Sequence, residues 1–191
     1  MTKTIVHQAR CERGVTLIDT MVVLAVMTII GSMATMQMVT VRRSLKGDGA
    51  MRVVMAQLVT ARETAMTQRR NIEVQFLGEN WLQIVRHEVP SGTTLVTNVA
   101  LEGNARYSLV DGVPDIPEDS NGNATAVSFG TTPLIMFTPS GSLVDSAGAP
   151  LNGTIFLSVD GQPESARAVT VLGAVGRVLA YRWTGRAWKR V

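Results

Sequence analysis

The sequence contains few of the residues that build catalytic and metal centres. Cys11 is the only cysteine among 191 residues, which excludes an internal disulfide bond and a cysteine-rich zinc site. With His7 and His87 as the only histidines, we find no credible metal cluster or Ser–His–Asp triad. Glycine-rich phosphate loops and dinucleotide fingerprints are also absent. We therefore expect a protein that is not an enzyme and that holds no metal or cofactor.

Acidic residues are missing from the end of the chain. No Asp or Glu follows Glu164, whereas six basic residues do. The net charge of the whole chain is only +3, so the total by itself indicates no partner. The basic C-terminal segment is the part to consider for binding to a polyanion.

Proline is absent from the first 89 residues, so one helix could extend from about Val15 to about Arg70. Asp19 is the only charged residue between Val15 and Val41. As a helix, residues 15–41 would be roughly 40 Å long, enough to cross the apolar core of a bilayer, which is about 30 Å thick. A carboxylate in such a span costs about 3 kcal/mol on insertion scales, so Asp19 needs an explanation.

Three interpretations of the N-terminus are open. A secretory signal peptide could be cleaved near Ser32-Met33-Ala34, but the apolar run continues past this site, and Asp19 would lie in its most apolar part. A plain single-pass anchor accounts for the span and leaves Asp19 unexplained. The third interpretation rests on the stretch from Arg13 to Asp19 (RGVTLID), which resembles the processing site of type IV prepilins and type II secretion pseudopilins.

This resemblance implies a maturation step and a location. A prepilin peptidase would cut between Gly14 and Val15, remove residues 1–14 as a leader, and methylate the new N-terminus. Residues 15–41 would then be a single span of the bacterial inner membrane, and the basic leader agrees with a periplasmic C-terminal domain. The family usually has phenylalanine after the cut and glutamate five residues in, whereas this chain has Val15 and Asp19.

The spacing gives Asp19 a physical role in this interpretation. Cleavage after Gly14 creates an ammonium group at Val15, one helical turn from Asp19 and on the same face. A carboxylate in the first turn interacts favourably with the helix dipole and an ammonium group does not, so the two charges compensate each other. In a filament, Asp19 could instead meet the free amine of a neighbouring subunit. The resemblance implies this assembly contact, and the spacing shows only that it is feasible.

Residues 42–70 are predicted to continue the helix as an amphipathic segment. The residues at three- and four-residue steps are Leu45, Met51, Val54, Met55, Leu58, Val59, Arg62, Ala65 and Met66. Gly47-Asp48-Gly49 is the weak point, because two glycines in one turn cost about 2 kcal/mol relative to alanine. The sequence leaves open whether the helix is kinked there or broken into two helices.

Residues 71–191 are predicted to form a β-rich globular domain. Asn71–Leu77 and Trp81–Arg86, separated by Gly78-Glu79-Asn80, have the pattern of a β-hairpin. The further expected strands are Thr94–Ala100, Ala105–Val110, Ala126–Phe129, Leu134–Phe137, Thr154–Val159, Ala166–Leu172 and Arg177–Trp183. A long helix packed on an antiparallel sheet gives an α+β fold.

The C-terminal half carries a second resemblance. The turn Phe137-Thr138-Pro139-Ser140-Gly141 and the pair Gly176-Arg177, in this order around the last strands, look like motifs of the GspH/FimT group of minor pseudopilins. With the processing site, they imply a pilin-like fold and a minor pseudopilin of a type II secretion system that assembles with other pseudopilins. The alternative is a FimT-like minor type IV pilin with a DNA-binding tail.

The tail of the chain alternates bases with aromatic residues. Its candidate DNA-binding residues are Arg182, Arg186, Lys189 and Arg190. Such bases hold phosphates, and rings such as Trp183 and Trp188 can stack on the bases of single-stranded nucleic acid. In FimT-type motifs a second arginine follows the first by two residues, whereas this tail has no arginine two residues after Arg186. We favour the other interpretation, an edge strand whose charges prevent aggregation while a tryptophan packs into the core.

Two further segments were considered for ligand binding. The loop Asp111–Asn123 concentrates oxygen ligands, but it lacks EF-hand spacing, and its prolines favour a solvated loop over a calcium site. His87, beside Glu88 at the end of a strand, is expected at the surface.

Overall fold

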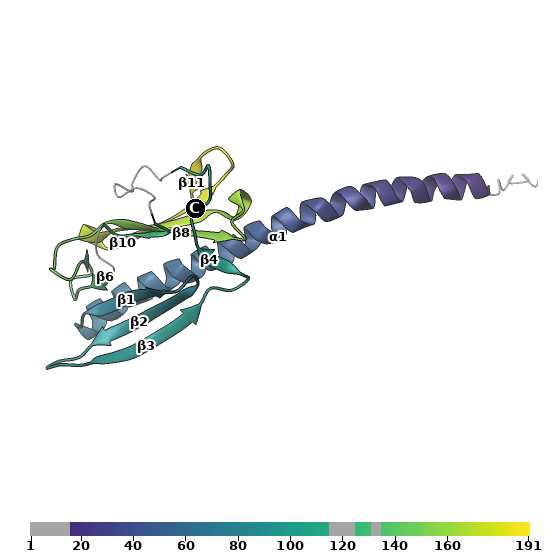
Figure 1. Cartoon of the computed structure of the whole chain (residues 1–191). Helices are drawn as coiled ribbons and strands as arrows, with labels where there is room; N and C mark the ends of the chain where they lie inside the picture. Colours follow the sequence, from purple (N-terminus) through teal and green to yellow (C-terminus); the bar gives the residue numbers. More distant parts are fainter. Residues whose placement is uncertain (1–15, 115–124, 131–134) are drawn as a thin grey trace, which may run out of the picture. The chain divides into compact units, whose positions relative to one another are not determined.

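The computed structural model describes residues 16–114, 125–130 and 135–191 (Figure 1). They divide into two compact units, with the boundary between Val39 and Thr40. The predicted leader and the predicted cut between Gly14 and Val15 lie outside the described residues.

Helix α1 comprises Leu17–Gln68 and is 52 residues long. It is continuous through Gly47-Asp48-Gly49, so the alternative of two separate helices is wrong. The helix ends just before Arg69, whose φ of 50° is a left-handed conformation of the kind that terminates helices. Among the described residues, α1 alone contains a stretch long and apolar enough to cross a membrane, by length and composition.

The first antiparallel sheet has the strand order β3-β2-β1-β6-β7. Its strands are β1 (Ile72–Leu77), β2 (Trp81–His87), β3 (Thr93–Ala100), β6 (Ile135–Phe137) and β7 (Leu143–Val144). The predicted hairpin is confirmed, because β1 and β2 pair with Val74 opposite Ile84 and Leu77 opposite Trp81. Strand β7 was not predicted, because a strand of two residues has no periodicity to detect.

The second antiparallel sheet has the order β11-β10-β9-β8-β4, and β5 also pairs with β8. Its strands are β4 (Ala105–Tyr107), β5 (Val127–Ser128), β8 (Gly153–Val159), β9 (Arg167–Leu172), β10 (Arg177–Trp183) and β11 (Trp188–Arg190). Two short 3₁₀ helices, η1 (Pro163–Ser165) and η2 (Gly173–Val175), connect β8 to β9 and β9 to β10. The expected strands are confirmed, although β4 is shorter than the predicted Ala105–Val110.

One apolar cluster joins α1 to both sheets of the second unit. Its helix members are Ala50, Met51, Val54, Leu58, Ala61 and Ala65. They cluster with Val74 of the first sheet and Val169 of the second. This confirms the α+β class and the pilin-like plan of a long N-terminal helix packed on antiparallel strands. Leu45, Val59 and Met66 are exposed and not buried as the periodicity predicted, because they lie outside the stripe of α1 that packs into the core.

Candidate assembly and helix-anchoring site

The start of α1 is closed by a reciprocal pair of contacts between Thr16 and Asp19. The backbone N–H and the hydroxyl of Thr16 donate to Asp19 Oδ2 at 3.0 and 2.7 Å, and the Asp19 N–H donates to Thr16 Oγ1 at 3.3 Å. This is a capping box, with aspartate in the place of the usual glutamate. The carboxylate therefore faces the start of the helix, on the side of the predicted new amine. The Thr-x-x-Asp spacing that predicts such a cap was visible in the sequence and was missed.

The first unit presents an uncovered apolar surface. Leu17 is 77% exposed and Ile18 is 68% exposed. No part of the apolar stretch of α1 is buried by other residues of the described chain. Isolated apolar side chains are common on protein surfaces, but a continuous apolar helix needs lipid or other helices around it. The surface beside Asp19 is therefore suited to a membrane and to helix packing.

In the second unit, Gly47 lets α1 approach the connection between β8 and β9. A β-carbon at Gly47 would lie 2.5 Å from the carbonyl oxygen of Ser165. Ser165 is itself fixed, because its hydroxyl accepts a hydrogen bond from the Val159 N–H at 2.9 Å and lies 2.7 Å from the Gln162 carbonyl oxygen. The glycine that weakens the helix locally is thus required by packing.

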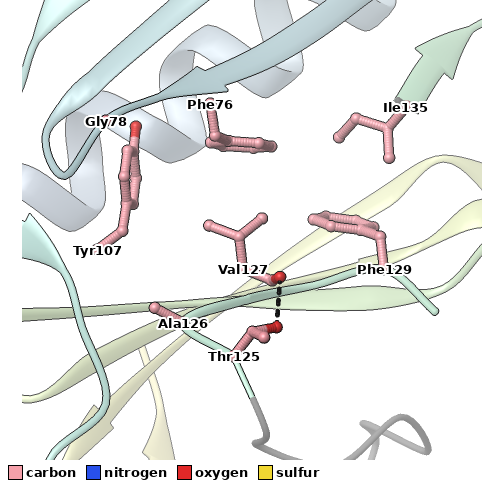
Figure 2. Close-up of a pocket in the computed structure, with 8 residues that line it drawn as sticks. All are labelled: Phe76, Gly78, Tyr107, Thr125, Ala126, Val127, Phe129 and Ile135. Atoms are coloured by element: carbon pink, nitrogen blue, oxygen red, sulfur yellow. Dashed lines mark hydrogen bonds between the residues drawn. The ribbon is translucent and has the colours of Figure 1, made fainter. Parts of the chain in front are cut away.

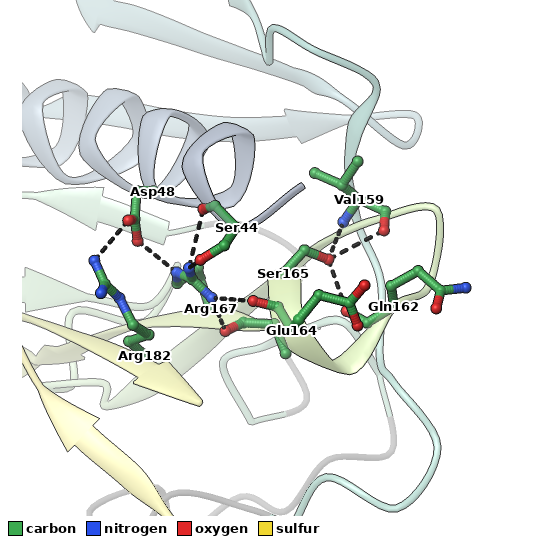
Figure 3. Close-up of polar contacts among 9 residues, drawn as sticks. Ser44, Asp48, Val159, Gln162, Glu164, Ser165, Arg167 and Arg182 are labelled. Atoms are coloured by element: carbon green, nitrogen blue, oxygen red, sulfur yellow. Dashed lines mark hydrogen bonds and ion pairs between the residues drawn. The ribbon is translucent and has the colours of Figure 1, made fainter. Parts of the chain in front are cut away.

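The neighbouring Asp48 holds α1 through two arginines of the second sheet (Figure 3). Arg167 of β9 is fully buried, and its Nε donates to Asp48 Oδ1 at 2.6 Å. Arg182 of β10 reaches Asp48 Oδ2 with a terminal nitrogen at 2.5 Å. Burial lowers the pKa of Arg167, and the Asp48 carboxylate opposes that shift. The polar segment in the middle of α1 is therefore stabilised by tertiary ion pairs.

Arg167 makes four further hydrogen bonds, to three residues. One terminal nitrogen donates to the carbonyl oxygen and the hydroxyl of Ser44, at 3.0 and 2.8 Å. The other donates to the carbonyl oxygens of Glu164 and Ala166, at 3.1 and 2.8 Å. A buried guanidinium group is tolerated only when its donors are satisfied in this way.

Arg62 of α1 brings the two C-terminal motifs together. Its Nε donates to the carbonyl oxygen of Gly141 at 3.0 Å, and a terminal nitrogen donates to that of Val175 at 3.3 Å. Gly176 has a φ of 60°, and a β-carbon there would lie 1.9 Å from the Gly141 carbonyl oxygen. The turn that ends at Gly141 and the pair Gly176-Arg177 are thus parts of one contact with the helix.

The basic tail forms an edge strand, as favoured from the sequence. Strand β11 pairs with β10, with Trp188 opposite Trp183, and the two rings are 5.5 Å apart. Trp188 also donates from Nε1 to the Pro114 carbonyl oxygen at 2.6 Å. Of the candidate DNA-binding residues, the structure exposes Arg186, Lys189 and Arg190. Arg182 lies directly opposite Lys189 in the β10–β11 pair, and its guanidinium group forms an ion pair with Asp48.

The remaining candidates show no ligand-binding arrangement within the described ranges. Residues 115–124 of the proposed calcium loop lie outside them, and the described part of the chain contains no group of three metal-ligating side chains. His87 lies at the end of β2, where its Nε2 is 2.8 Å from Glu73 Oε2. It is half-buried and pairs with an otherwise buried carboxylate.

An open aromatic pocket of about 330 Å³ lies between strands of the two sheets (Figure 2). Phe76 meets Tyr107 edge-on at 5.4 Å and stacks on Phe129 at 6.1 Å. Burial raises the pKa of Tyr107, whose hydroxyl has no hydrogen-bond partner among the described residues. The hydroxyl of Thr125, which also lines the pocket, donates to the Val127 carbonyl oxygen at 2.8 Å.

Comparisons with known proteins identify a family model and solved structures that are similar to this chain. Two crystal forms of the type IV minor pilin FimU from Pseudomonas aeruginosa are similar, with TM-scores of 0.47 and 0.48 and 18% and 17% identity. They cover 69% and 75% of this chain, and 84% and 96% of the FimU chains. No curated protein matches the sequence. The family model described as type II transport protein GspH matches residues 50–174, from the buried half of α1 to the turn before β10, and this chain belongs to the GspH family.

Proposed function

We propose that this GspH-family chain is a minor pseudopilin of a type II protein secretion system. It is inserted into the bacterial inner membrane through residues 15–41, cut between Gly14 and Val15, and built into a periplasmic filament with other pseudopilins. Its role is assembly and not catalysis. The observation that carries the proposal is Asp19, the only charge in an otherwise apolar and uncovered helix, positioned in the first turn.

The geometry of Asp19 supports a contact that can change partners. Its Oδ2 accepts two hydrogen bonds from Thr16, and both groups are exposed. An ammonium group is a stronger partner for a carboxylate than a neutral hydroxyl or amide. In a filament, the amine of a neighbouring subunit can therefore join or replace the Thr16 contacts and fix the register between helices.

The second unit supports this role by holding α1 firmly. Asp48 is tied to Arg167 and Arg182, and Arg62 is tied to the turn at Gly141. These contacts lie in β9, in β10 and in the turn at Gly141, so this part of the helix cannot move past the sheets without breaking the buried Asp48–Arg167 ion pair.

The proposal is tested by the N-terminus of the mature chain. After co-expression with a prepilin peptidase, N-terminal sequencing and intact mass should identify a chain that begins at Val15. A Gly14→Leu variant, which blocks the site without touching the apolar span, should keep its first fourteen residues. A wild-type chain that retains its leader, or that begins beyond Ala34, would contradict the proposal.

A second function is favoured by one observation, the exposed bases of the C-terminal hairpin. A FimT-like minor type IV pilin could use Arg186, Lys189 and Arg190 to bind the phosphates of DNA. A gel-shift assay with the domain from residue 42 onward, compared with a variant that has alanine at all three positions, separates this function from the first. The absence of a shift at low salt eliminates DNA binding.

A further inference from the structure

Strand β3 forms one margin of the first sheet and is open on its outer side (Figure 1). It is eight residues long, contains no charged residue, and consists mostly of threonine and valine, which favour strands. Leu95 is 54% exposed and Val96 is 43% exposed. A long, uncharged and exposed edge strand is the kind that pairs with a further strand.

The other margins of the described sheets are short or charged. Strand β7, at the opposite margin of the first sheet, has two residues, and in the second sheet β5 has two and β4 has three. Strand β11 also has three residues and carries Lys189 and Arg190. Short strands and basic side chains protect a sheet edge from pairing. Strand β3 has neither form of protection.

The hydrogen-bond ladder with β2 determines which backbone groups of β3 point outward. Leu101, directly after β3, donates its N–H to the Asn80 carbonyl oxygen at 2.7 Å. Bonded and non-bonded pairs alternate in an antiparallel ladder, so Val99 is the next residue bonded to β2. The N–H and C=O of Asn98 and Ala100 are therefore directed away from β2, and no described residue outside β2 forms a backbone hydrogen bond with them.

A bulge at Val96 limits this open ladder to Thr97–Ala100. The register between β2 and β3 shifts between Ile84 and Val85, so Val96 has no partner on β2. A bulge bends an edge strand and interrupts its pairing. The four residues that remain are enough for a further strand, because β4 and β11 each pair with their neighbours over three residues.

We propose that β3 is a docking edge, to which an extended and uncharged strand of another pseudopilin adds through Thr97–Ala100. Main-chain hydrogen bonds provide the affinity in this mode of recognition, and alternate side chains provide the specificity. Thr97 and Val99 lie opposite Ile84 and Leu82, which are buried on the core face of the sheet. The side chains of the added strand that share this face extend it, so we expect them to be apolar or β-branched.

The identity of the partner rests on the proposed function. Antiparallel pairing of β3 with β3 of a second copy would reverse the direction of α1 in one of the two chains. Anchoring in one membrane requires both chains to enter it in the same direction. The added strand therefore belongs to a different subunit of the filament.

Photo-crosslinking of the full chain tests the contact in bacterial membranes that also contain the prepilin peptidase and the other pseudopilins of the same system. A benzophenone amino acid at Leu95, beside the open ladder, should give an adduct with another pseudopilin that mass spectrometry identifies. The same amino acid at Ser146, which is exposed just after β7 at the opposite margin of the sheet, should give at least fivefold less adduct.

Two substitutions of Asn98 distinguish backbone pairing from side-chain contact. Asn98→Pro removes the outward N–H and keeps the bonds to β2, since an edge strand accepts proline where its nitrogen faces solvent. The adduct from Leu95 should then fall at least fivefold. Asn98→Ala removes the same side chain and keeps the N–H, so it should leave the adduct unchanged.

A second pair of variants tests the same edge if Asn98→Pro does not accumulate in the membrane. Val96→Lys places a charge on the edge and should reduce the adduct severalfold. Leu77→Lys is its control, because Leu77 of β1 has the same exposed fraction of 43% and lies away from β3. Equal yields from these two variants would overturn the docking edge.

Three other results would also overturn it: equal adducts from Leu95 and Ser146, equal adducts from Asn98→Pro and Asn98→Ala, or adducts only between copies of this chain. Intact mass and pull-down of the other pseudopilins from the same membranes report the proposed function separately. A chain that begins at Val15 and recovers its partners, but gives no adduct from Leu95, would reject the docking edge and keep the pseudopilin assignment.

Discussion

Asp48 of α1 and Arg167 of β9 form a buried ion pair, with 2.6 Å between Asp48 Oδ1 and Arg167 Nε. The two residues are 119 positions apart in the sequence. Asp48 lies between two glycines, where the helix is intrinsically weakest. The pair therefore stabilises the helix at the point where its own sequence favours melting, and it ties the helix to the last strands of the domain.

Replacing Asp48 should destabilise the second unit strongly. Asp48→Ala leaves the Arg167 guanidinium group buried without its carboxylate, and breaking such a pair costs about 3–5 kcal/mol. Chemical denaturation of the domain from Thr40 onward measures the free energy of unfolding. Glu63→Ala removes an exposed acid from the same helix and should change the free energy of unfolding by less than about 0.5 kcal/mol. Equal effects of the two substitutions would contradict the role of the ion pair.

The two glycines that flank Asp48 should respond in opposite directions. Gly47→Ala puts a methyl group against the Ser165 carbonyl oxygen and should destabilise the domain by about 1–3 kcal/mol. Gly49→Ala meets no atom within 4 Å and should stabilise it by up to about 1 kcal/mol, because alanine favours the helix. Thermal melts of the two variants and the wild type measure these changes in stability. If both Gly47→Ala and Gly49→Ala lowered the stability of the domain, helix propensity would not explain the expected difference between the two positions.

Asp19→Ala should separate processing from assembly. The cut lies five residues away and should still occur, whereas the charge that pairs with a neighbour's amine is lost. When the variant is produced at wild-type yield, its pull-down of the other pseudopilins should fall to background. Intact mass measured on the same samples checks that cleavage has occurred. Asp19→Glu keeps the charge and should recover binding. Wild-type recovery of the partners by the alanine variant would refute the assembly role.

Tyr107 should make the stability of the domain sensitive to alkaline pH. Because burial raises the pKa of Tyr107 above its ordinary value of 10.0, the folded state prefers the neutral phenol. Its contribution is fully present below pH 10 and is lost as the pH rises further. In urea titrations at pH 8 and pH 11, Tyr107→Phe should lose less stability than the wild type over this interval. At pH 8 it should be as stable or slightly more so, since the hydroxyl has no partner among the described residues.

Much of the local structure could be predicted from the sequence. The absence of proline and the steps of three and four predicted α1 to within a few residues of its end at Gln68. The period of two predicted the hairpin of β1 and β2 and the strands β8, β9 and β10. These signals are local, because a helix or strand buries one face and repeats its apolar residues accordingly.

The division of the strands into two sheets could not be predicted in this way. It depends on which strands pair across long distances: β6 joins β1, and β8 joins β4. The exposed positions Leu45, Val59 and Met66 were also assigned to the wrong face of α1. Periodicity identifies a stripe, but its direction is set by the sheets that pack on the helix.

The sequence by itself determined the contiguous features of this protein: one long helix, an apolar segment with a single acid, a resemblance to a prepilin processing site and a β-rich domain. Each of these depends on neighbours within a few residues. Only the tertiary structure decided that Asp48 meets Arg167, that Arg62 joins the turns at Gly141 and Gly176, and that Arg182 also pairs with Asp48. The physical reason is that an ion pair depends on a distance of a few ångströms in space, and that distance exists only after the helix and both sheets have packed around one core.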